Sequence, residues 1–133
     1  EDDIKGAREI IQYLQNQNIP IALATSSGRK RITRRLDMAG LAPFFSAIVT
    51  GEQVVHGKPA PEIYQLACRH LGISPEQALA IEDSPNGILS ASRAGMQVVM
   101  VPDLVQPSPD LSSLLTACCA SLTAVRDWLA GRL

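Results

Sequence analysis

Short apolar runs alternate along this chain with longer segments that have helical spacing, and this alternation is the feature that most constrains its fold. Each run is apolar almost throughout rather than at every second residue, which is typical of strands buried on both faces. Strands separated by helices indicate a parallel sheet covered by helices. The sequence therefore predicts a single α/β domain with strands at 19–25, 45–50, 78–82 and 96–101.

The segments between these runs carry the signals of helices. Apolar residues recur at helical spacing from Asp3 onward. Gly40, Gly72 and Gly95 suit helix ends, because glycine readily adopts the left-handed conformation found there. From Pro102 the chain is rich in Pro and Ser, and we expect no helix or strand there before the last helix. The other predicted helices lie at 28–39, 59–72, 86–95 and 121–129, the last with Val125, Trp128 and Leu129 facing inward.

Composition limits the classes of function. The chain has 133 residues, the size of one domain, and its net charge of −1 argues against a general nucleic-acid or membrane surface. No apolar run is long enough to span a bilayer. Cys68, Cys118 and Cys119 lack the spacing of a disulfide framework or a zinc site, so we expect a cytoplasmic protein. A basic run without aromatic residues is read as a solvated helix face and comprises Arg29, Lys30, Arg31, Arg34 and Arg35.

Small polar residues follow the first predicted strand, at the end where parallel α/β sheets bind their ligands. Thr25, Ser26 and Ser27 stand directly before Gly28 and a helix. Hydroxyl and backbone N–H groups at a helix N-terminus form a site for an anion. Because Ser and Thr are also the usual helix caps, the alternative is that they only cap this helix.

A lysine follows the second predicted strand. Lys58 lies between Gly57 and Pro59, and the proline restricts the backbone of this one cation. The stretch from Gly51 is not a Walker phosphate-binding loop, because five residues separate the glycines and Pro59 replaces the required Ser or Thr. The alternative for Lys58 is an ordinary solvated side chain.

Two adjacent acids end the third predicted strand. Glu82 and Asp83 would repel each other unless a cation lies nearby, and paired carboxylates are typical ligands of Mg²⁺. The alternative is that one acid caps the helix that follows. Hydroxyls, a lysine and an acid pair on successive strand ends are the groups that phosphoryl transfer requires.

These motifs resemble those of the haloacid dehalogenase-like hydrolases, in the phosphatase and β-phosphoglucomutase branch. "IALATSS" resembles the second motif of that family, "HGKPAPEIY" the third and "AIEDSPNGILSASRAGM" the fourth. The resemblance extends from about Lys5 to Val101, and the last helix also fits. It implies a Rossmann-like, three-layer α/β/α core and Mg²⁺-dependent hydrolysis of a small phosphorylated metabolite. A β-phosphoglucomutase-like phosphosugar mutase is the alternative activity.

The resemblance also assigns roles to individual residues. It implies that the Thr25 hydroxyl and the Ser26 backbone N–H bind the phosphate. Lys58 would neutralise the phosphate and the nucleophile, and Asp83 would hold Mg²⁺, with Glu82 beside it as a ligand or behind the ligands. Substrate contacts are a weaker expectation for three residues: Ser27, Arg29 and Lys30.

The first motif of the family is missing from this sequence. That motif is a strand ending in Asp-x-Asp, whose first Asp forms an aspartyl-phosphate and whose second acts as acid and base. Asp2 and Asp3 precede a helix and follow no apolar strand, so they are not that motif. The cap domain is missing too. We therefore expect residues 1–133 to be the C-terminal portion of the core, inactive alone and completed by a preceding segment or another chain.

Two other classes compete with the enzyme. A receiver-type signalling domain also combines Thr or Ser, Lys and an acid pair, but its acid pair lies on the first strand and its lysine near the end. The order Thr25, Lys58, Asp83 argues against that class. A non-catalytic remnant that binds a partner through an open sheet edge remains an alternative.

Overall fold

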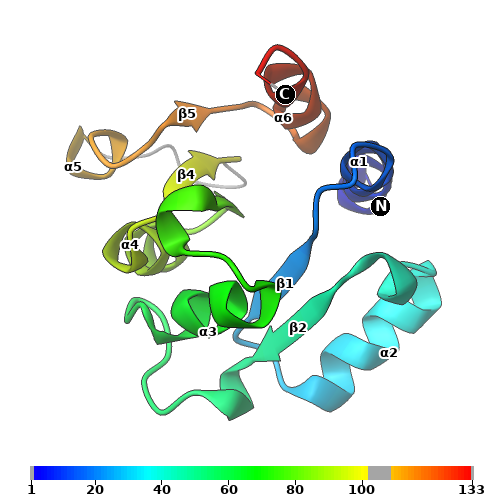
Figure 1. Ribbon diagram of the computed structural model, residues 1–133, viewed down its shortest axis with the longest axis horizontal. Coiled ribbons are helices and arrows are strands. Elements are labelled where there is room, and N and C mark those ends of the chain that lie inside the picture. Colours follow the sequence, from blue (N-terminus) through cyan, green and yellow to red (C-terminus); the bar gives the residue numbers. More distant parts are fainter. Residues whose placement is uncertain (1, 102–108, 133) are drawn as a thin grey trace.

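The computed structural model describes residues 2–101 and 109–132 as an α/β fold (Figure 1). The strands are β1 (Ala22–Thr25), β2 (Ala47–Thr50), β3 (Leu79–Glu82), β4 (Gln97–Met100) and β5 (Ala117–Cys118). The helices are α1 (Asp2–Asn16), α2 (Arg29–Ala39), α3 (Glu62–Leu71), α4 (Pro85–Ala94), α5 (Pro109–Ser112) and α6 (Leu122–Ala130). Short 3-10 turns lie at Ala42–Phe44, Gly51–Gln53 and Pro75–Gln77.

All strand pairs are parallel, and they form two sheet pieces. β1 pairs with β2, with Thr25 opposite Thr50. The order in the other piece is β3-β4-β5, with Glu82 opposite Met100. Among the residues that the structure describes, no strand pairs with the remaining edge of β1 or of β3. These two edges line one cavity, and the strand ends that bear Thr25 and Glu82 both open into it.

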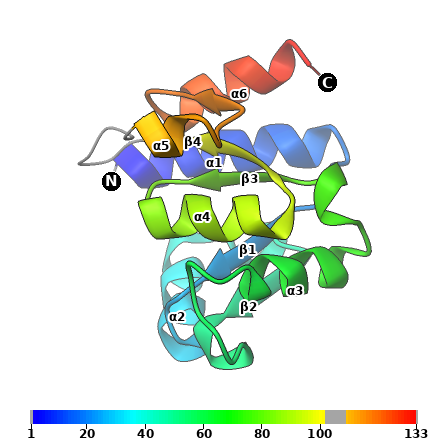
Figure 2. The same cartoon turned by 90° about the vertical axis from the view of Figure 1, so that its left-hand side faces the viewer.

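Helices cover both faces of the strands, which makes three layers. Neighbouring residues of one strand point to opposite faces: Val98 and Met100 pack with α3 and α4, and Val99 packs with α1, α2 and α6. Figures 1 and 2 both show α1 and α6 side by side. Thr123 Oγ1 joins them by donating to Glu9 Oε2 over 3.1 Å. Burial on both faces is what the unbroken apolar runs predict.

The predicted strands and helices are present, with shorter strands than the apolar runs. β1 begins at Ala22 rather than residue 19, after Pro20, which cannot donate to a strand pair. The three predicted glycine ends are observed, each with positive φ: Gly40, Gly72 and Gly95. On the last helix, α6, Val125 is fully buried in the apolar cluster that also contains Ile10 and Ile11 of α1, and Trp128 is half-buried against that cluster.

Two elements were not expected from the sequence, α5 and β5. β5 is held by Thr116 N–H donating to Val98 O over 2.8 Å and Cys119 N–H donating to Met100 O over 2.9 Å. A strand of two residues has no periodicity to detect, so only its pairing with β4 reveals it. The expectation of an irregular segment at 102–108 lies outside the described residues. No helix in the described part of the chain is long and apolar enough to cross a membrane.

Candidate active site

The loop after β1 folds on itself before α2 begins. Ser27 N–H donates to Thr25 Oγ1 over 3.1 Å. The cap residue of α2 is Gly28, which has no side chain to offer, so the hydroxyls of this loop do not cap the helix. Thr25 Oγ1 accepts one hydrogen bond here and retains its own proton to donate. The cap alternative is therefore wrong for this loop.

The turn after β2 packs closely against the same loop. A Cβ on Gly51 would lie 2.8 Å from the Ser26 carbonyl oxygen, so only glycine allows this approach. The carboxylate of Glu52 accepts the Arg29 N–H at the start of α2. The carboxyl ends of β1 and β2 therefore form one tightly packed edge, and Ser26 lies in it.

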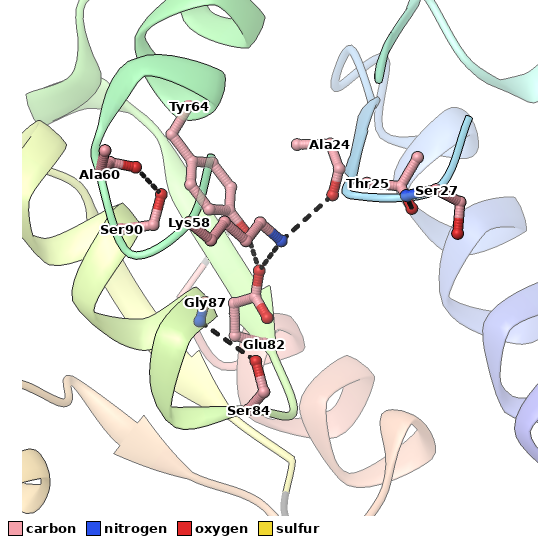
Figure 3. Close-up of polar contacts among 10 residues, drawn as sticks. All are labelled: Ala24, Thr25, Ser27, Lys58, Ala60, Tyr64, Glu82, Ser84, Gly87 and Ser90. Atoms are coloured by element: carbon pink, nitrogen blue, oxygen red, sulfur yellow. Dashed lines mark hydrogen bonds and ion pairs between the residues drawn. The ribbon is translucent and has the colours of Figure 1, made fainter. Parts of the chain in front are cut away.

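Helix α4 holds the loop that carries Lys58. Ser90 Oγ is fully buried and donates to Ala60 O over 2.6 Å (Figure 3). Arg93 Nη1 donates to Pro59 O over 3.2 Å. Since α4 begins directly after the acid pair and its cap, the lysine loop and the acids share one rigid support.

Lys58 and Glu82 form a buried ion pair. Lys58 Nζ lies 2.7 Å from Glu82 Oε2, and the two side chains are 13% and 7% exposed. The Tyr64 hydroxyl donates to the same carboxylate oxygen. Lys58 is therefore not a solvated surface lysine. Close pairing and hydrogen bonding of this kind offset the free-energy cost of burying two charged groups.

Tyr64 completes this group from α3, and we call Lys58, Tyr64 and Glu82 the lysine cluster. The Lys58 ammonium lies 5.2 Å from the centre of the Tyr64 ring, within the range of a cation–π contact. Burial and the Glu82 carboxylate raise the pKa of the Tyr64 hydroxyl well above its usual value. The hydroxyl therefore stays protonated and acts as a donor.

Lys58 also spans the cavity between β1 and β3. Its Nζ donates to Ala24 O over 3.4 Å, as Figure 3 shows, which brings the ammonium next to Thr25. Residues from Thr25 and Ser26 on one side to Glu82 and Asp83 on the other line this cavity of about 1380 Å³. The predicted phosphate-binding residues, the lysine and the acids are thus brought to one place.

The two acids differ in their surroundings. Glu82 is buried, and its Oε1 lies so close to Gly87 that a Cβ there would be 1.9 Å away. Asp83 is exposed at the end of β3. The cap of α4 is Ser84, whose Oγ accepts the Gly87 N–H over 3.1 Å, so neither acid caps this helix.

The acid pair fits a magnesium site only in part. In the described part of the chain, no three His, Cys, Asp or Glu residues group to hold a metal ion. Magnesium usually keeps several waters and binds one or two carboxylates together with phosphate oxygens. The exposed Asp83 suits that role, whereas Glu82 Oε2 is already engaged by Lys58 and Tyr64.

The three residues that were expected to contact substrate do not line the cavity: Ser27, Arg29 and Lys30. The Arg29 guanidinium turns to β2, where it donates to Ile48 O over 2.8 Å and to Gln53 Oε1 over 2.7 Å. Lys30 is exposed on α2, and neither residue is among those that line the cavity. Ser27 is not among them either, although its N–H orients Thr25.

Sequence reasoning missed Tyr64, Ser90 and Arg93. Tyr64 lies on the buried face of α3, and a phenol on such a face needs a polar partner. That was its only signal in the sequence. Ser90 and Arg93 act through backbone carbonyls 30 or more residues away, and no spacing rule detects such contacts.

Comparison with known proteins identifies the family of this chain. Residues 2–101 match the family described as haloacid dehalogenase-like hydrolase. The chain is 35% identical over 124 residues to the phosphorylated carbohydrates phosphatase of Thermotoga maritima, a match that covers 93% of this chain and 56% of that protein. It is 40% identical over 123 residues to the probable pseudouridine-5'-phosphatase of Drosophila melanogaster, where the match covers 88% and 53% respectively. The chain thus spans about half the length of these curated relatives.

A solved structure shares the fold. The HAD family hydrolase from Deinococcus radiodurans, solved with bound phosphate and sodium, is 32% identical to this chain. The match has a TM-score of 0.84 and covers 95% of this chain and 58% of that one.

Proposed function

The chain belongs to the haloacid dehalogenase-like hydrolase family, and we propose that it forms the phosphate-binding and metal-binding part of a Mg²⁺-dependent phosphomonoester hydrolase. The observation that carries the proposal is the position of Lys58. Its ammonium lies between Ala24 O beside the Thr25 loop and the Glu82 carboxylate. A cation fixed next to hydroxyl and N–H donors suits the oxygens of a phosphate monoester.

Each residue of this chain has a separate role in the proposal. The Thr25 hydroxyl and the Ser26 N–H bind phosphate oxygens, and the Lys58 ammonium neutralises the charge that develops on them. Asp83 supplies one carboxylate to Mg²⁺, which when bound offsets negative charge on the phosphoryl group. Glu82 holds Lys58 in place rather than binding the metal.

We further propose that the nucleophile lies outside residues 1–133, on a strand between β1 and β3. Ile21 O accepts the Ser46 N–H over 2.7 Å on the β2 side. Since backbone groups alternate in direction along a strand, those of Ala24 point away from β2. By the same alternation Ile81 points away from β4, because Glu82 O accepts the Val101 N–H there over 2.8 Å. Both sets are oriented to pair with an inserted strand, which we assign to a preceding segment of the same polypeptide.

The substrate class is a small phosphorylated metabolite. Relatives named as phosphatases of phosphorylated carbohydrates and of pseudouridine 5'-phosphate support this class. The missing cap region is expected to choose among such substrates. A phosphosugar mutase remains the alternative, and it would give an isomeric sugar phosphate instead of free phosphate.

The test compares the 133-residue chain with a longer polypeptide that includes the preceding segment. We expect Mg²⁺-dependent release of phosphate from p-nitrophenyl phosphate and sugar phosphates only by the longer polypeptide. In it, Asp83→Asn is expected to lower kcat/KM at least about 100-fold, the scale of losing one electrostatic contact in the transition state. Asp37→Asn, an exposed acid on α2, is the matched control and should stay within about twofold of the parent.

Two results would contradict the proposal. Turnover by the 133-residue chain alone would mean that no external nucleophile is needed. Full activity of Asp83→Asn would exclude Asp83 from metal binding.

A further inference from the structure

One buried titratable side chain near the site has no role in the proposed reaction. Tyr64 is 7% exposed and one of only two tyrosines, the other being Tyr13 on α1. A phenol costs free energy when it is buried, unless its hydroxyl finds a partner. An apolar phenylalanine would fill the same place without that cost. The presence of a hydroxyl at this buried position therefore indicates a specific role for it.

We propose that Tyr64 is a positioning residue for Lys58, acting through Glu82. Its hydroxyl donates to Glu82 Oε2, which also accepts the Lys58 ammonium over 2.7 Å. Its ring lies 5.2 Å from that ammonium. Figure 3 shows the three side chains converging from the loop before α3, from α3 itself and from the end of β3.

The need for such a residue follows from the flexibility of lysine. An ammonium on a four-carbon stem is compatible with many orientations, and a single ion pair leaves most of them open. Glu82 is confined on its other side by the Cα of Gly87, where a Cβ would be 1.9 Å from Oε1. The Tyr64 hydroxyl fixes the remaining oxygen. The carboxylate therefore has one orientation, and it holds Lys58 towards Ala24 O and the Thr25 loop.

Tyr64 lines the same cavity as Thr25 and Ser26, but its hydroxyl donates to Glu82 rather than to either of them. Its effect on phosphate passes through Lys58, so the inference rests on the proposed function of that lysine. It predicts that removing only the hydroxyl weakens phosphate binding while the fold is kept.

Titration with inorganic phosphate, followed by NMR of the full chain, tests this inference. We expect Tyr64→Phe, which keeps the ring, to weaken phosphate binding about tenfold, the scale of one hydrogen bond to a charged group. Tyr13→Phe removes the same atom from a half-buried tyrosine on α1 and should change the affinity less than about twofold.

A second measurement detects the hydrogen bond between Tyr64 and Glu82 directly and does not depend on phosphatase activity. With ¹³C at Cζ of tyrosine, the chain gives two signals, because it has two tyrosines. Glu82→Gln should shift the Tyr64 signal and leave the Tyr13 signal in place. Lys58→Met should do the same, since it removes the other partner of the Glu82 oxygen.

The outcomes separate the inference from the proposed function. If Lys58→Met binds phosphate as the parent does, the proposed role of Lys58 is wrong. If Lys58→Met weakens binding but Tyr64→Phe only lowers the melting temperature, Tyr64 is structural and the inference is overturned. An unmoved Tyr64 signal in Glu82→Gln would also overturn it.

Discussion

At the scale of single residues, the site depends on a carboxylate whose two oxygens are both in close contact with neighbouring residues. Glu82 is 7% exposed and accepts hydrogen bonds from Lys58 and Tyr64 on one oxygen. Its other oxygen packs on Gly87. The glycine at this position is therefore explained by the carboxylate it faces and not by a positive φ, since Gly87 lies in the first turn of α4.

Gly87→Ala tests that explanation. The new Cβ would lie 1.9 Å from Glu82 Oε1 and 2.1 Å from its Cδ, so Glu82 has to move and leave Lys58. We expect the free energy of unfolding to fall by about 1–3 kcal/mol, as for overpacked sites. Alanine is the better helix former by roughly 1 kcal/mol, so helix propensity predicts the opposite sign. Urea unfolding followed by circular dichroism measures the free energy of unfolding and so distinguishes a decrease from an increase.

The matched control for this substitution is Gly131→Ala. The nearest atom to its Cβ would be Trp128 O at 3.8 Å, an ordinary contact distance. We expect a change within about 0.5 kcal/mol. A Gly87→Ala chain that is as stable as the parent would show that Glu82 is free to move.

At the scale of elements, α4 links the parts of the site. Its N-terminus follows the acid pair, its second turn donates through Ser90 to the loop of Lys58, and Arg93 reaches the same loop. The strand before it ends in Glu82. Movement of this one helix would displace the lysine and both acids together, so we expect the proposed phosphate binding to depend on the stability of α4.

Ser84→Ala removes the cap of α4 and tests this coupling. Ser84 Oγ accepts the Gly87 N–H over 3.1 Å, and losing such a cap costs about 1 kcal/mol of unfolding free energy. We expect weaker binding of inorganic phosphate as well. Ser121→Ala is the control, because Ser121 caps the distant α6 by accepting the Ala124 N–H over 3.0 Å. It should lower stability by a similar amount and leave phosphate affinity unchanged; equal losses of affinity in both variants would refute the coupling.

At the scale of the whole molecule, the cavity between β1 and β3 divides the sheet. Backbone groups of Ala24 and Ile81 face this cavity, and Lys58 Nζ donates a hydrogen bond to the Ala24 carbonyl oxygen. Unpaired strand edges of this kind favour pairing with another strand. The fold is therefore expected to gain order when a parallel strand enters, and the proposed nucleophile would arrive on that strand.

Hydrogen exchange tests the state of these edges. In the 133-residue chain we expect the amides of Ala24 and Ile81 to exchange much faster than those of Leu23 and Ala80, which face a paired strand. In the longer polypeptide their exchange should slow at least about 100-fold, because a new strand pair must open first. NMR resolves each amide. Strong protection of Ala24 and Ile81 in the short chain at low concentration would contradict the open edges.

The outcome for individual residues shows how far sequence reasoning reaches. Thr25, Ser26, Lys58 and the acid pair were expected at one edge of the sheet, because carboxyl ends of parallel strands meet there, and the structure brings them together. Arg29 was expected near substrate from its closeness in sequence. Its guanidinium donates to Ile48 O on β2 instead, a contact between residues 19 apart that no local pattern shows.

Apart from α5 and β5, the sequence by itself determined the order of strands and helices and the strand ends that carry polar groups, because periodicity, glycine ends and apolar runs are local properties. Only the tertiary structure decided which of the two acids is buried, which residue meets it and what holds the lysine loop. Tyr64 and Glu82 are 18 residues apart, and Ser90 and Ala60 are 30 apart. Such contacts depend on how α3 and α4 pack across the strands, and no local pattern records that packing.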